Sequence, residues 1–262
     1  MKTCPNAALE IIIGLSPLHL YIKRVAGSRA ISLRAINQIK INNGRKGHCN
    51  IYTKLGMAEE VIQLSDLIVK TIDCRRNFYI IIPKKETISN VISSLPRHAS
   101  IWYTDGSKTD KGTGAGVVGP GFQLSLSLGK APTVFQAEIL AIEICALQCI
   151  NKRYKGVEIY IISDSQASLV ALGASVFNSQ LTWSCYHNLK TLGSENKVTL
   201  LWSPGHSGTQ GNEMADCRAK AGANNTFTGP EPSIAFSKSH LRRCITAWEQ
   251  KKRKRTGYPQ RG

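Results

Sequence analysis

Four acidic side chains occupy positions from which they could work together on a metal ion. Asp105 ends a predicted strand, Asp164 directly follows another, Glu138 lies early in a predicted helix, and Asp216 lies on a later helix. Residues at strand ends and nearby helix starts can converge on one edge of an α/β sheet. Carboxylates gathered in this way repel one another, and one pKa rises unless cations neutralise them. Mg²⁺ prefers a few carboxylates with waters and phosphate oxygens, and two such ions can activate water against a phosphodiester.

Hydrophobic periodicity predicts the elements that must position these acids. From residue 100 the pattern alternates between strand-type and helix-type segments in the order βββαβααβα, a mixed α/β domain. Strands are expected at 100–104, 112–118, 122–128, 157–162 and 198–202, and helices at 133–150, 165–172, 181–192 and 211–223. Before this domain we expect two helices within 5–40, another over 57–72 and a short strand at 78–82. A last helix is expected at 234–248, followed by a disordered basic tail.

Positive charge is divided unevenly along the 262 residues, whose net charge is +17. Residues 1–100 carry 15 basic and 6 acidic side chains, 101–223 carry 10 and 9, and 224–262 carry 9 and 2. A basic excess indicates a polyanionic partner, either nucleic acid or an anionic membrane surface, and excludes the acidic, aromatic-poor class of solvating chains. Both flanks are therefore basic around a nearly neutral middle.

Cysteine usage and the N-terminal segment bear on the compartment. The eight cysteines include no Cys-x-x-Cys pair and are irregularly spaced, so we expect reduced thiols and no disulfide partner. The apolar stretch 7–21 contains Glu10 and Pro17, and we expect neither a signal peptide nor a membrane partner. An intracellular protein is predicted. The cluster Lys251–Arg255 is either a solvated tail or a patch for nuclear import or nucleic-acid binding. The second interpretation favours the nucleus.

Four segments resemble the type 1 ribonuclease H domain. They are Tyr-Thr-Asp-Gly-Ser at 103–107, Gln-Ala-Glu at 136–138, Ser-Asp-Ser-Gln at 163–166, and 202–216 with Trp-Ser-Pro-Gly-His-Ser-Gly and Gly-Asn-Glu-Met-Ala-Asp. The resemblance covers about residues 99–223. It implies an α/β, ribonuclease H-like fold: a five-stranded mixed sheet flanked by helices, preceded by a smaller, mostly helical region.

The resemblance also implies a reaction and its residues. Asp105, Glu138, Asp164 and Asp216 would hold two Mg²⁺ ions, with Mn²⁺ as a substitute. His206, on a Gly-flanked loop, would help proton transfer or product departure. The RNA strand of an RNA–DNA hybrid would be hydrolysed to 3′-hydroxyl and 5′-phosphate ends. The candidates for contacting the hybrid are Gly106, Ser107, Ser165 and Gln166, for which turn and cap chemistry is the simpler interpretation.

Two segments depart from the family pattern. Val134-Phe135 stands where many members carry a polar pair, which puts a base-edge contact in doubt. Residues 173–180 are short and uncharged where some members carry a basic protrusion, so grip on the substrate must come from elsewhere or be weak. Two alternatives to the hybrid ribonuclease stay open: a retroelement-derived protein that binds nucleic acid without cleaving it, and a DNA nuclease of the same fold.

The flanks carry a second resemblance. Residues 6–20 resemble the connector between reverse transcriptase and ribonuclease H in polyproteins of insect-type non-LTR retrotransposons; an ordinary amphipathic helix pair is the alternative. This predicts a connector region at 1–97, a catalytic domain at 98–223 and a basic tail at 224–262. The reverse transcriptase of the parent element is then a further expected partner.

Overall fold

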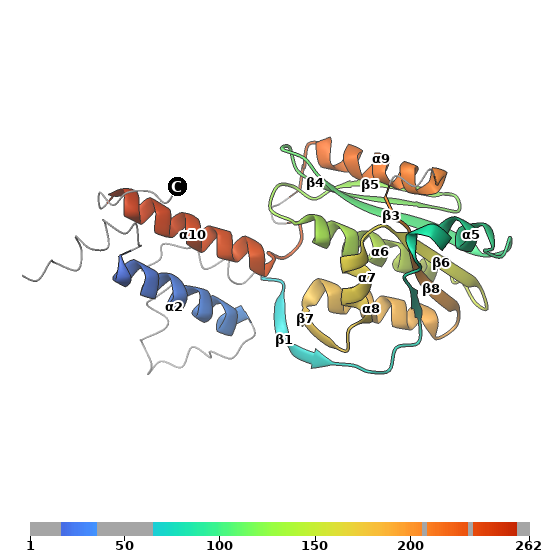
Figure 1. The fold of residues 1–262 in the computed structure, drawn as a ribbon, viewed down its shortest axis with the longest axis horizontal. Helices are drawn as coiled ribbons and strands as arrows, with labels where there is room; N and C mark the ends of the chain where they lie inside the picture. The colour runs from blue at the N-terminus through green and yellow to red at the C-terminus, as the bar shows by residue number, and fades with distance from the viewer. Residues whose placement is uncertain (1–16, 36–64, 206–208, 230–232, 256–262) are drawn as a thin grey trace, which may run out of the picture. The chain divides into compact units, whose positions relative to one another are not determined.

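The computed structural model describes residues 17–35, 65–205, 209–229 and 233–255, shown as a ribbon in Figure 1. The chain divides into two compact units. One spans Ile68–Ala235, and the other joins Met1–Leu67 to Phe236–Gly262. The predicted division at 97 and 223 stays a prediction.

A six-stranded mixed sheet forms the frame of the Ile68–Ala235 unit, in the order β2-β8-β6-β3-β4-β5. The strands are β2 (Tyr79–Ile81), β3 (Ser100–Lys108), β4 (Thr113–Gly119), β5 (Phe122–Ser127), β6 (Glu158–Ser163) and β8 (Lys197–Trp202). β2, β8, β6 and β3 run parallel, and β4 and β5 continue the sheet antiparallel. The mixed α/β fold is thus confirmed. The sheet has six strands rather than five because the strand predicted at 78–82 joins its edge beside β8.

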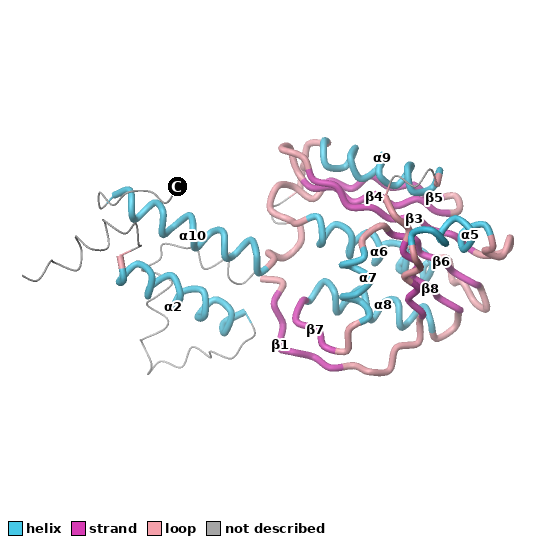
Figure 2. Tube along the Cα trace, viewed as in Figure 1, coloured by secondary structure: helices cyan, strands magenta, loops and turns pink. Residues whose placement is uncertain are grey.

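Helices cover both faces of this sheet, as the tube in Figure 2 shows. They are α5 (Ile88–Ser93), α6 (Val134–Asn151), α7 (Gln166–Gly173), α8 (Gln180–Gly193) and α9 (Gln210–Asn224), with a 3₁₀ turn at Lys85–Thr87. Side chains of neighbouring strand residues point to opposite faces. Gly114 and Gly116 of β4 face α9, whereas Gly106 of β3, paired with Ala115, faces α6. The two helices that carry candidate metal ligands therefore approach the sheet from opposite sides.

The main hydrophobic core lies between the sheet and helices α6 and α8. Its largest fully buried members include Trp102, Ile139, Ile142, Tyr186 and Phe177. By length and composition alone α6 is apolar enough to cross a membrane, and it is the one such helix among the described residues. With 56% of that apolar window buried, α6 behaves as the core helix of a folded domain. The six cysteines that the structure describes are free thiols, while Cys4 and Cys49 lie outside the described residues.

A two-stranded sheet differs from what the sequence predicted. β1 (Leu67–Ile72) pairs with β7 (Val176–Ser179). The sequence predicted a helix over 57–72 and no strand between the helices expected at 165–172 and 181–192. The helix prediction is wrong for 67–72, because β-branched residues dominate this segment and its partner strand lies about a hundred residues away. Residues 57–64 lie outside the described part. Asp73 secures the pair: its backbone N–H donates to the Ser175 carbonyl at 3.1 Å, and its carboxylate is 2.5 Å from Lys190 Nζ.

The second unit contains two described helices, α2 (Leu18–Ala35) and α10 (Lys238–Arg255). α2 starts directly after Pro17, within the region 5–40 where the sequence predicted two helices. α10 runs to Arg255 and so includes the basic cluster that was expected in a disordered tail; that prediction is wrong for 249–255. Lys and Arg side chains at the end of a helix interact favourably with its dipole. Residues 6–16 of the connector motif lie outside the described residues.

Candidate active site

Parallel pairing of β3 with β6 brings two of the predicted acids side by side. The register pairs Thr104 with Ser163, so Asp105 and Asp164 each follow one member of this pair. Asp105 still belongs to β3, whereas Asp164 comes directly after β6. Their neighbourhood therefore follows from strand register and does not depend on loop conformation.

Helix α6 supplies the third acid from its first turns. A capping box starts the helix: the Gln136 backbone N–H donates to Thr133 Oγ1 and the Thr133 N–H donates to Gln136 Oε1, each at 3.2 Å. Gln136 Nε2 also donates to the Ala235 carbonyl at 2.8 Å, which fixes the first turn. Glu138 lies two residues further on, directly against Gly106 of β3.

Asp105, Glu138 and Asp164 form one cluster, in which a carboxylate oxygen from each lies within 4.8 Å of those of the other two. Burial, with the charges of Asp164 and Asp216, raises the pKa of Asp105 to about 7. Burial, with the charges of Asp105 and Asp164, raises the pKa of Glu138 to about 9. The Gly106 N–H donates to both carboxylates but offsets only part of this effect. Without a cation, the cluster favours protonated acids at neutral pH.

The cluster fits a divalent cation on a further observation. Oε2 of Glu138 is buried and has no hydrogen-bond partner among the residues that the structure describes. A buried carboxylate oxygen without a partner is costly, and a cation would satisfy it. A cavity of about 40 Å³ adjoins the cluster and is lined by Asp105, Asp164, Gly205, Asn212, Glu213 and Asp216. That volume is enough for a water-sized ligand. Hard oxygen donors of this type suit Mg²⁺ or Mn²⁺.

Asp216 reaches the same cavity from the other face of the sheet. Glycines in β4 seat helix α9: a Cβ on Gly116 would lie 2.2 Å from the Ala215 carbonyl oxygen, and one on Gly114 would lie 2.1 Å from the Ala223 nitrogen. Asp216 lines the cavity, but it is absent from the 4.8 Å cluster, and its carboxylate is 2.6 Å from Lys220 Nζ. The fourth predicted ligand is thus at the site, paired with a lysine.

The loop after β8 closes one side of the cavity. Ser203 N–H donates to the Ser163 carbonyl at 3.0 Å, and Trp202 Nε1 donates to the Asp164 carbonyl at 3.0 Å. A Cβ on Gly205 would lie 2.9 Å from Asp164 Oδ2, so only glycine leaves this carboxylate undisturbed. His206 lies outside the described residues, and its role stays a prediction.

The structure places the residues expected to contact nucleic acid at a helix cap, on a helix's first turn and on strand β3. Ser165 caps helix α7, its hydroxyl accepting from the Ser168 N–H at 3.4 Å, while Gln166 is exposed on the first turn. Ser107 is half-buried on β3. Gly106 supplies the N–H that the acids share. A role in binding is compatible with these positions and stays a prediction.

Sequence reasoning missed four residues that contribute to the site: Ser163, Asn212, Glu213 and Lys220. The Ser163 hydroxyl donates to Glu138, and Asn212 Nδ2 donates to the Pro204 carbonyl at 3.4 Å. Lys220 lies one helical turn after Asp216, and this i,i+4 spacing was the signal that could have identified it.

Residues 97–224 match the family model of RNase H. This segment is an RNase H domain. No curated protein sequence matches the chain. The RNase H domain coincides with the sheet from β3 onward and its helices, and it contains all four acids. Such domains bind and cleave RNA–DNA hybrids and use divalent metal ions, and the acidic cluster gives this domain the donor groups for such ions.

Proposed function

We propose that this chain hydrolyses the RNA strand of RNA–DNA hybrids, leaving 3′-hydroxyl and 5′-phosphate ends. The observation that carries the proposal is the buried group of Asp105, Glu138 and Asp164 inside an RNase H domain. A protein that only binds nucleic acid would gain nothing from this arrangement, because uncompensated buried carboxylates are costly. The cluster therefore favours a working nuclease over a retroelement remnant that no longer cleaves.

The residues divide the work. Asp105, Glu138 and Asp164 would hold two Mg²⁺ or Mn²⁺ ions, with Asp216 as the fourth ligand residue. When bound, the ions would supply positive charge at the scissile phosphate and lower the pKa of the attacking water. The Gly106 N–H and the Ser163 hydroxyl orient the carboxylates, and Lys220 forms an ion pair with Asp216. His206 would receive or deliver a proton as product leaves, which is the role that the family resemblance implies.

We further propose a type 1 domain from a non-LTR retrotransposon polyprotein, acting inside the cell and in the nucleus. Support comes from the four family segments, the connector motif at 6–20 and the basic cluster Lys251–Arg255. Reverse transcriptase of the same element would be its partner, and 1–97, 98–223 and 224–262 its functional divisions.

A cleavage assay with the full chain tests the activity. Three substrates of the same sequence are compared: an RNA–DNA hybrid with its RNA strand labelled at the 5′ end, a labelled RNA duplex and a labelled DNA duplex. Each is incubated with Mg²⁺ or with EDTA. We expect Mg²⁺-dependent cleavage of the hybrid alone, with products that a DNA polymerase can extend from their 3′ ends. Cleavage of the DNA duplex instead would support a DNA nuclease of the same fold.

Two variants make the assay specific. Asp164→Asn should reduce the rate at least a thousandfold, because it removes a charge from the metal-binding cluster. Asp110→Asn changes the same charge at an exposed position outside the cavity and should leave the rate unchanged. Equal rates for Asp164→Asn and the unaltered chain would rule out the proposal.

A further inference from the structure

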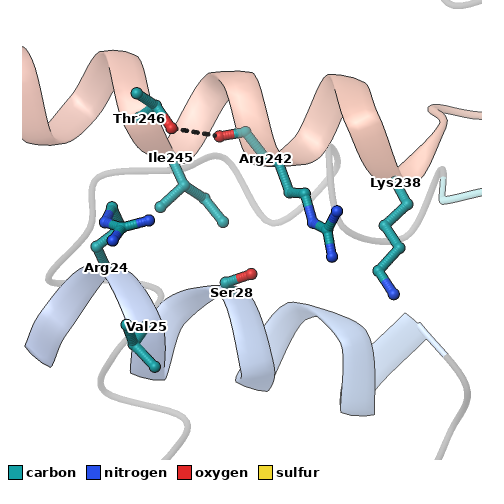
Figure 3. Close-up of a pocket in the computed structure, with 7 residues that line it drawn as sticks. All are labelled: Arg24, Val25, Ser28, Lys238, Arg242, Ile245 and Thr246. Carbon is teal, nitrogen blue, oxygen red and sulfur yellow. Dashed lines mark hydrogen bonds between the residues drawn. The ribbon is translucent and has the colours of Figure 1, made fainter. Parts of the chain in front are cut away.

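A basic groove lies between α2 and α10, within the unit that joins the two ends of the chain (Figure 3). Its volume is about 510 Å³, in the range of ligand-binding clefts. Arg24 and Ser28 of α2 line one side, and Lys238, Arg242 and Ile245 of α10 line the other. Figure 3 shows the Arg242 guanidinium and the Ser28 hydroxyl turned into the space between the helices.

The charge of the groove is only partly neutralised. Arg24 Nε forms an ion pair with Glu249 at 2.9 Å. Lys238 and Arg242 are exposed, and neither forms an ion pair with any residue in the described part of the chain. α10 carries eight Lys and Arg side chains against one Glu, and the sequence of α2 contains no acidic residue. Within the described part of the chain, the positive charges of Lys238 and Arg242 are therefore not neutralised by ion pairs.

The spacing of Lys238 and Arg242 suits a phosphate backbone. Lys238 and Arg242 are four residues apart on α10, which is about 6 Å along the helix axis and close to the separation of adjacent phosphates on one strand. Arg can bind phosphate oxygens with two N–H groups, and Lys adds a point charge. Ile245 gives the groove an apolar floor.

We propose that the α2–α10 groove binds the phosphate backbone of the nucleic acid on which this chain acts. The proposal rests on the proposed function for the choice of partner, and it assigns grip on the substrate to a surface outside the RNase H domain. That domain is nearly neutral and has β7 and an uncharged turn where a basic protrusion could have stood. A concave site with cations facing inward admits a strand of phosphates better than the flat surface of a membrane.

Binding is measured with the full chain and a fluorescent hybrid of about 20 base pairs, in EDTA so that no cleavage occurs. The groove variant is Lys238→Gln with Arg242→Gln. The matched control is Arg243→Gln with Lys251→Gln, which removes the same charge from exposed positions of α10 outside the groove. Circular dichroism and thermal unfolding check that both variants fold as the unaltered chain does.

We expect the groove variant to bind about tenfold more weakly at 0.1 M salt, and the slope of log affinity against log salt to fall by about 1.5, since two phosphate contacts are lost. The control should retain affinity within about twofold. Equal losses in both variants would show diffuse attraction to α10, and no loss in either would show that the groove is unused; each result overturns the proposal.

Two further readouts separate the alternatives. Vesicles of phosphatidylserine and phosphatidylcholine should bind the unaltered chain and the groove variant equally; groove-dependent binding to vesicles with unchanged hybrid binding would overturn the proposal in favour of a lipid surface. In the cleavage assay, the groove variant should raise KM and leave kcat unchanged. If the unaltered chain binds hybrid through the groove but never cleaves it, the proposed function fails while the groove proposal stands.

Discussion

A Cβ atom on Gly106 would lie 2.9 Å from both the Cγ atom and the backbone nitrogen of Glu138. Gly106 lies inside strand β3 and not in a turn, and its missing side chain leaves the space that the Glu138 side chain occupies. Through its N–H it also binds the carboxylates of both acids. Strand β3 and helix α6 are thus fitted to each other at the point where the acids converge.

Gly106→Ala tests this fit. The methyl group must displace the start of α6, because two of its nearest contacts are backbone atoms, and we expect a loss of about 1–3 kcal/mol in the free energy of unfolding. Displacement of Glu138 should also raise the Mg²⁺ concentration for half-maximal cleavage about tenfold or more. Urea unfolding and Mg²⁺ titration measure the two effects. Gly173→Ala is the control, since its methyl would meet only the ends of Ile80 and Arg76; an equal effect there would contradict the argument.

The raised pKa values predict how the stability of the metal-free protein depends on pH. In the native state Asp105 and Glu138 keep their protons up to about pH 7 and about pH 9. In the unfolded chain both side chains have the ordinary pKa of a carboxylic acid. The native state then binds more protons than the unfolded state, so its stability falls as pH rises from about 4 through these values. In EDTA, the unfolding temperature should fall between pH 5 and pH 9.

Mg²⁺ and a variant identify the acids responsible. Mg²⁺ should raise the unfolding temperature at pH 8 more than at pH 5, because it binds the deprotonated acids. At pH 8 in EDTA, Asp105→Asn should stabilise the protein by about 1–3 kcal/mol, since it removes a buried charge. The exposed Asp110→Asn should not. A stabilisation by Mg²⁺ that is the same at both pH values would exclude these acids as its binding site.

Sequence patterns located the acids because strand and helix periodicity is local. Asp164 closely follows the strand predicted from the β-branched run 157–162, and parallel topology then places it beside Asp105. Patterns could not reveal close packing between distant segments. The segment 112–118 was predicted as a strand, but the pattern did not reveal why it contains glycines. They allow the backbone of α9, about a hundred residues later in the chain, to pack closely against β4. β1 was predicted as helix for the same reason, since its partner β7 decides its conformation.

Lys220 provides a separate test of the site. Its ammonium pairs with Asp216 and lowers the pKa of Asp105 through its charge. In the metal-free protein it therefore partly substitutes for a bound metal ion. Lys220→Gln should reduce the Mg²⁺ concentration for half-maximal cleavage about two- to fivefold, because a competing positive charge is removed. Lys111→Gln, at an exposed position outside the cavity, controls for net charge. A higher Mg²⁺ requirement would mean that Lys220 instead holds Asp216 in its ligating position.

Residues 68–97 contribute to the folded unit that contains the RNase H domain. Phe78 is buried in the main core and packs edge-on against Tyr186 with ring centroids 5.6 Å apart, and Asn77 Nδ2 donates to the Lys190 carbonyl at 2.9 Å. β2 covers the edge of β8. A fragment starting at residue 98 would expose that edge and leave a cavity in the core, and exposed strand edges promote aggregation.

Comparison of fragments 68–235 and 98–235 measures this contribution. The longer fragment should unfold in one cooperative transition, and its kcat on saturating hybrid should equal that of the full chain. The shorter one should aggregate or unfold at a much lower urea concentration. Phe78→Ala in the full chain tests the packing alone and should cost about 3–5 kcal/mol, whereas exposed Tyr79→Ala should cost far less. Equal stability of the two fragments would show that the RNase H domain is complete without β2.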